Sequence, residues 1–110
     1  MGDNGSADSS RRVPESLRTL AEYLERALDG ATSIVMMRHT DDACTVYLGD
    51  PAGLPEDLKQ IGTIATSLAN DMLESTSSGA NQMRIGGQVY RFVRSFTQVG
   101  DTAAVVFSAD

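Results

Sequence analysis

The last part of the chain, residues 83–110, reads MRIGGQVYRFVRSFTQVGDTAAVVFSAD and decides the fold class. Gly86-Gly87 is a two-residue signal for a β-hairpin turn, and Val99-Gly100-Asp101 turns the chain again. The stretch therefore predicts three strands, over residues 83–85, 88–97 and 102–108. Strands joined by short turns pair antiparallel. Residues 103–107 are apolar on both faces, which is typical of a strand at the centre of a sheet.

Two further strands are predicted upstream, over residues 34–37 and 44–48. A short polar segment, residues 39–42, separates them and predicts a hairpin. Residues 34–37 are also apolar on both faces, so this strand and strand 103–107 are expected at the centre of the sheet.

Two helices are predicted from apolar residues that recur every three or four positions. The first begins at Pro14 and stops at Gly30, with its apolar stripe at Leu17, Leu20, Ala21, Leu24, Ala27 and Leu28. The second begins near Pro55-Glu56-Asp57, with its stripe at Leu58, Ile61, Ala65, Leu68 and Met72. The element order is then αββαβββ. We expect an α+β domain in which a five-stranded antiparallel sheet carries one helix on each face, over residues 13–110, after a tail at residues 1–12.

The composition excludes several classes of protein. The chain has 110 residues, one Cys, one His and a net charge of −6. One Cys excludes an intramolecular disulfide, and this Cys with one His leaves a structural zinc site short of ligands. An acidic chain has no general attraction for nucleic acid. No apolar run approaches the length of a membrane span, and residues 1–12 lack the apolar core of a secretory signal, so a cytoplasmic protein is expected.

A search for catalytic, metal-binding or cofactor-binding residues predicts none. His39 and Cys44 could meet across the first hairpin, but no oxyanion donor is identifiable, and an exposed turn histidine with a buried strand cysteine is the preferred interpretation. Asp41, Asp42 and Asp50 lack the spacing of a calcium loop, and no glycine-rich phosphate loop occurs. Arg84, Arg91 and Arg94 surround the Gly86-Gly87 hairpin. Because Arg91 and Arg94 should point to opposite faces of a strand, they are interpreted as rim charges of the sheet and not as one anion site.

The most informative feature is the flank of the second helix, where small side chains would let another backbone come close. Strand 83–85 is short and is expected at an edge of the sheet. Together they favour self-association through a surface made of Ile61, Gly62, Ala65, Thr66, Ala69, Met83 and Ile85. The alternative is that the second helix only packs tightly on its own sheet.

The element order and three stretches resemble the Roadblock light-chain family, which includes a dynein light chain and bacterial regulators of Ras-like GTPases. The stretches are LERALDGATSIVMMRHTDDACTVYLGD, LKQIGTIATSLANDML and residues 83–110, and the resemblance covers residues 17–108. It implies the strand order 2-1-5-4-3 and dimerisation through the second helix and third strand. The implied function is a non-catalytic homodimer that regulates or scaffolds a small Ras-like GTPase.

Two departures from the family pattern leave the partner open. The first hairpin has Asp41-Asp42-Ala43 where many members have a glycine turn, and no third helix follows the last strand. Two other functions are therefore kept as alternatives. One is a small-molecule sensor of the profilin-like or PAS-like type, and the other is an acidic dimer similar to secretion chaperones.

Overall fold

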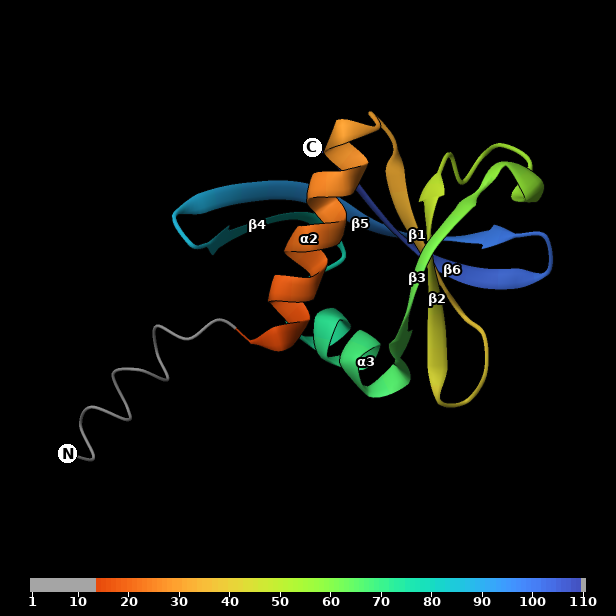
Figure 1. The fold of residues 1–110 in the computed structure, drawn as a ribbon, viewed down its shortest axis with the longest axis horizontal. Helices are drawn as coiled ribbons and strands as arrows, with labels where there is room; N and C mark the ends of the chain where they lie inside the picture. The colour runs from red at the N-terminus through yellow and green to blue at the C-terminus, as the bar shows by residue number, and fades with distance from the viewer. Residues whose placement is uncertain (1–13, 110) are drawn as a thin grey trace.

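The computed structural model describes residues 14–109, and the tail predicted over residues 1–12 lies outside them (Figure 1). The elements are α2 (Glu15–Asp29), β1 (Ser33–Arg38), β2 (Ala43–Gly49), a single 3₁₀ turn η1 (Pro55–Asp57), β3 (Lys59–Ala65), α3 (Thr66–Glu74), β4 (Gly79–Ile85), β5 (Gln88–Val99) and β6 (Thr102–Ala109). No helix in this part of the chain is long and apolar enough to cross a membrane.

The strands form one antiparallel sheet in the order β3-β2-β1-β6-β5-β4. The α+β class is as predicted, and the doubly apolar strands β1 and β6 lie side by side at the centre. The five predicted strands follow one another as β2-β1-β6-β5-β4, with β4 at an edge. The predicted strand number is wrong, because a sixth strand, β3, extends the sheet beside β2.

The helix predicted from Pro55 to Met72 is also wrong. Residues 59–65 form β3, and α3 begins only at Thr66. Ile61, Thr63 and Ile64 are β-branched and Gly62 is a poor helix former, so local preference opposes a helix here. The three-and-four spacing from Leu58 to Met72 arises because a strand and a short helix follow each other without a loop.

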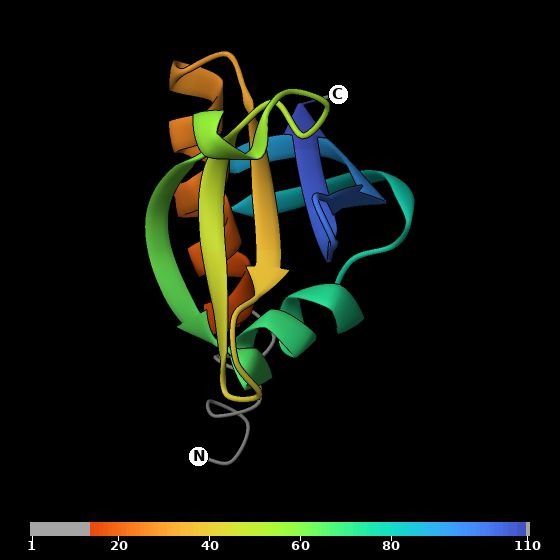
Figure 2. The same ribbon diagram turned by 90° about the vertical axis from the view of Figure 1, so that its right-hand side faces the viewer.

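Both helices pack on the same face of the sheet, which corrects the expected three layers. One buried cluster contains Leu20 and Leu24 of α2, Ala69 and Met72 of α3, and Ile34, Met36, Phe92 and Phe107 of the sheet. In Figure 1 both helices lie to the left of strands β1–β3, and Figure 2 shows the sheet from its other side. Phe92 and Phe107 are fully buried in this cluster, with ring centroids 5.8 Å apart in an edge-to-face contact.

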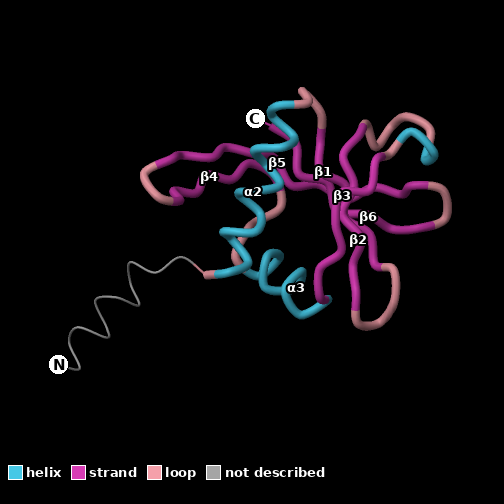
Figure 3. The backbone as a smooth tube through the Cα atoms, viewed as in Figure 1, coloured by secondary structure: helices cyan, strands magenta, loops and turns pink. Residues whose placement is uncertain are grey.

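The other face of the sheet is covered in part by the chain itself. Val35, Val99 and Ala104 form a second buried cluster, joined by Met37, Tyr47 and Leu58. The β5–β6 hairpin crosses β1–β3 steeply in Figure 3, which brings its end toward the outer side of β1 and β2. Strong twist of the sheet thus gives both central strands a cover on both faces.

Gly62 of β3 lies against the side chain of Tyr23 of α2. A Cβ at this position would stand 2.5 Å from the hydroxyl oxygen of Tyr23, whereas the nearest ring carbons would stand 3.5 and 3.6 Å away. Burial raises the pKa of the Tyr23 hydroxyl. The small residue therefore serves contact between α2 and β3 within the chain.

We expect Gly62→Ala to lower the free energy of unfolding by about 1–3 kcal/mol, because the added methyl group overlaps the Tyr23 hydroxyl. In a Tyr23→Phe background the same change should cost far less, since the remaining ring contacts are of ordinary length. Urea unfolding of the wild type, the two single variants and the double variant measures the coupling between Gly62 and the Tyr23 hydroxyl. Equal costs of Gly62→Ala in both backgrounds would show that the hydroxyl does not set the packing distance.

Candidate interaction surface

The β4–β5 hairpin carries the most open edge of the sheet. All seven residues of β4 pair with β5 in unbroken register, from Gly79 opposite Arg94 to Ile85 opposite Gln88. Gly86 and Gly87 make the turn with φ values of +57° and +83°, as a type I′ turn requires. No other strand of the described chain pairs with the outer side of β4.

The register fixes which backbone groups of β4 point outward. A two-residue turn makes Ile85 and Gln88 a hydrogen-bonded pair, and such pairs alternate with non-bonded ones along an antiparallel ladder. Asn81, Met83 and Ile85 therefore bond to β5. The backbone N–H and C=O groups of the alternate residues, Ala80, Gln82 and Arg84, point away from the sheet and can bond another strand.

The opposite edge, β3, is protected in ways that β4 is not. Its pairing with β2 is interrupted by an irregularity between Val46 and Tyr47, which leaves Ile61 as an extra residue. Lys59 begins the strand and is exposed. Bulges and edge lysines discourage the addition of another strand, so β4 is the edge that is better suited to accept one.

The entry to β4 is held by two side chains. Asn81 accepts a hydrogen bond from the Ser77 backbone N–H (2.8 Å) and donates to the carbonyls of Ser77 (2.7 Å) and Gly79 (3.0 Å). Arg94, from the neighbouring strand, donates to the Leu73 carbonyl (2.8 Å), the Thr76 carbonyl (3.0 Å) and the Thr76 hydroxyl (2.8 Å). These bonds tie the end of α3 and the α3–β4 loop to β5, so the edge is preorganised.

Arg94→Met should lower the free energy of unfolding by about 2–3 kcal/mol, because it leaves two carbonyls at the end of α3 without their donor. Arg91→Met, on the opposite face of the same strand, is the matched control and should change stability by less than about 0.5 kcal/mol. Chemical denaturation gives both values. Similar costs for the two variants would mean that Arg94 does not anchor the loop.

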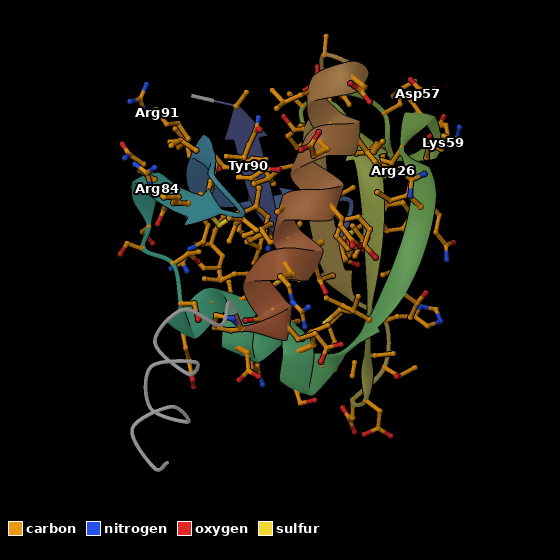
Figure 4. The ribbon with its side chains drawn as sticks, turned by 60° about the vertical axis from the view of Figure 1, so that its left-hand side comes forward. Arg26, Asp57, Lys59, Arg84, Tyr90 and Arg91 are labelled. Atoms are coloured by element: carbon orange, nitrogen blue, oxygen red, sulfur yellow. The ribbon has the colours of Figure 1, made fainter. Side chains whose placement is uncertain are left out.

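A groove runs between β4 and α2 on the helix-covered face. It has a volume of about 440 Å³ and is lined by Arg18, Ala21, Glu22, Glu25, Ile85 and Tyr90. At its floor the Tyr90 hydroxyl donates a short hydrogen bond to Glu25 (2.5 Å). This bond, with some desolvation, raises the pKa of Tyr90 above its ordinary value of 10.0. Figure 4 shows Tyr90 between the hairpin and α2.

Because the pKa of Tyr90 is higher in the folded protein than in the unfolded chain, its proton stabilises the fold at every pH below about 10. This stabilisation should be lost as the pH rises from 10 through the folded-state pKa. Tyr90→Phe should be less stable than the wild type at pH 7, with a difference that shrinks above pH 10. Urea unfolding between pH 7 and pH 11 tests this, and a constant difference would contradict it.

The residues predicted to form the interface do not all lie together. Ile61, Gly62 and Ala65 belong to β3, at the opposite edge from β4, and not to a helix. Thr66 begins α3, and Ala69 is buried in the core. Only Met83 and Ile85 lie on β4, half-buried on its helix-covered face. The small-residue stripe does not form one surface, because its first half is a strand.

The hairpin of β1 and β2 offers little chemistry. Cys44 is buried, and its sulfur lies 3.9 Å from the Thr66 hydroxyl, while His39 is exposed. No group of three possible metal ligands occurs among residues 14–109. A hollow of about 250 Å³ beside His39, Thr45 and Tyr47 is smaller than the roughly 300–1,000 Å³ of typical ligand sites.

Sequence reasoning missed the different roles of the three arginines. Arg94 is an internal anchor and not a rim charge. Arg84 and Arg91, which alternate with the helix-facing residues of their strands, are exposed on the uncovered face of the hairpin. The Gly86-Gly87 turn and the alternation of side chains along each strand predict this arrangement, because together they place Arg84 and Arg91 on the same face of the hairpin.

Comparison of the chain with protein-family models, with characterised proteins and with solved structures finds no match.

Proposed function

We propose that this chain is a non-catalytic regulator or scaffold that works by binding proteins, and that its first partner is a second copy of itself, paired through β4. The observation that carries the proposal is the edge of β4. This strand is regular over seven residues and free of bulges and proline, and it directs the backbone N–H and C=O groups of Ala80, Gln82 and Arg84 outward.

The surroundings of β4 support pairing of two copies. Antiparallel pairing of β4 with its copy would join two sheets into one and give an isologous interface of the kind that most homodimers use. Pairing over all seven residues is centred on Gln82, so on the helix-covered face Met83 and Ile85 of each copy would lie opposite Asn81 and Gly79 of the other, next to the groove along α2. These half-buried apolar side chains would lose their remaining exposure, which favours association.

The resemblance to the Roadblock family adds a candidate for the further partner, a small Ras-like GTPase. The resemblance implies dimerisation through the third predicted strand, residues 83–85, and this strand is part of β4. Pairing through β4 agrees with that part of the implied interface. The small-residue helix that the same resemblance assigned to the interface does not contribute, because Gly62 and Ala65 are on the far edge of the sheet. The GTPase proposal therefore depends on the resemblance alone. A small GTPase encoded next to this gene, which coelutes with the protein, would support it.

Gln82→Pro tests the dimer, because Gln82 directs its backbone N–H outward and proline removes no backbone hydrogen bond to β5. Size-exclusion chromatography with light scattering at about 100 μM should give the wild type twice the 11.7 kDa mass of the chain, and the proline variant one mass.

Gln82→Ala is the matched control, since it removes the same side chain but keeps the N–H, and it should remain a dimer. Circular dichroism would establish that both variants are folded. A wild type that elutes as a monomer, or a proline variant that stays dimeric, would refute pairing through β4.

A further inference from the structure

The β4–β5 hairpin has a charge composition unlike the rest of the chain. Residues 79–99 contain three arginines and no Asp or Glu, whereas the remaining residues carry 6 Lys or Arg against 15 Asp or Glu. Arg94 is used on the helix-covered face. Arg84 and Arg91 are the two charges left on the uncovered face, and both are exposed.

The two arginines are neighbours in the sheet. Arg84 lies opposite Val89, and Arg91 is two residues further along β5, opposite Gln82. Such diagonal neighbours are about 7–8 Å apart in an antiparallel pair. Figure 4 shows both side chains extending from the hairpin on the side away from α2.

The surface around them is partly shaped and partly apolar. The Gln82 side-chain oxygen accepts a hydrogen bond from Arg91 Nε (3.3 Å), which helps to orient that guanidinium group. Val89 beside them is 39% exposed, and Val93 is half-buried. The face thus offers two guanidinium groups over a small apolar strip.

We propose that this face binds an extended acidic segment of a partner protein, with Arg84 and Arg91 each pairing with one carboxylate. In an extended chain, side chains two residues apart lie on the same side at a spacing of about 6.8 Å, close to the separation of the two arginines. The segment therefore carries Asp or Glu at alternate positions. Arginine can hold a carboxylate through two parallel hydrogen bonds, which gives the contact its direction.

The charge distribution favours a short protein segment over a nucleic acid or an anionic membrane. The Debye length at physiological salt is about 8 Å, so a short segment on the hairpin is largely screened from the acidic remainder of the chain. A nucleic acid or a membrane surface extends well beyond two arginines and meets the rest of a chain with a net charge of −6. The face belongs to a single chain, so this inference does not depend on pairing of β4 with a second copy.

The test uses the full chain and a synthetic peptide of about ten residues that alternates Glu with Thr, with a Gln-for-Glu peptide of the same length as its neutral control. Two exposed ion pairs give weak binding, and we expect a dissociation constant on the order of 0.1–1 mM at low salt. Titration followed by backbone NMR should shift the amide signals of Gln82, Arg84, Val89 and Arg91.

The Arg84→Gln/Arg91→Gln variant should bind the Glu peptide about tenfold more weakly or not at all. The control variant Arg26→Gln/Lys59→Gln changes the net charge equally on α2 and β3 and should bind like the wild type. Equal losses in the two variants, equal binding of the Gln peptide, or absence of shifts at millimolar peptide would overturn the proposal. Tighter binding of an anionic vesicle or a DNA oligonucleotide to the same face would overturn it in favour of that partner.

Discussion

The fold depends on one constraint. Its two central strands, β1 and β6, are apolar on both faces, whereas the two described helices cover only one face of the sheet. Ile34 and Met36 of β1 face the helices, whereas Val35 and Met37 face the other way. The sheet meets this constraint by twisting, so that the end of the β5–β6 hairpin and Leu58 cover the outer side of β1. The same twist leaves the β4–β5 hairpin to extend from the body of the molecule, with one edge and one face open (Figure 1).

That open hairpin is held more firmly than an isolated two-stranded ribbon would be. Phe92, which lies opposite Asn81 in the β4–β5 ladder, is fully buried against Phe107, and Arg94 fastens the same strand to the end of α3. Asn81 fixes the first turn of chain before β4. An edge that is already ordered loses little conformational entropy when another strand pairs with it, which is why rigidity here favours binding.

Strand and helix periodicity in the sequence predicted most of the architecture. The helix from Pro14 to Gly30, the three predicted hairpins (β1–β2, β4–β5 and β5–β6), the central pair of strands and the edge position of residues 83–85 are all found. The segment from Leu58 to Met72 does not form the single helix that its spacing predicts, because a strand and a helix joined end to end reproduce a helical spacing over these fifteen residues. The β-branched residues around Gly62 opposed that interpretation and carried more information than the spacing.

The false helix over residues 58–72 also explains why only part of the candidate site could be predicted. Met83 and Ile85 follow from the short edge strand, whereas the proposed contribution of Gly62 and Ala65 followed from the helix that does not form. Gly62 does mark a close approach, but to Tyr23 of the same chain. The two-residue turn alone predicts that Arg84 and Arg91 lie near each other on one face, since that turn fixes the register of the whole hairpin.

The central claim is that β4 is an edge that pairs with a second copy, and amide hydrogen exchange along β4 tests it most directly. In dilute solution the N–H groups of Ala80, Gln82 and Arg84 should exchange rapidly, while those of Asn81, Met83 and Ile85, which bond to β5, should be protected. Raising the protein concentration should slow exchange at the first three and leave the others unchanged. Rapid exchange at Ala80, Gln82 and Arg84 at every concentration would contradict the account.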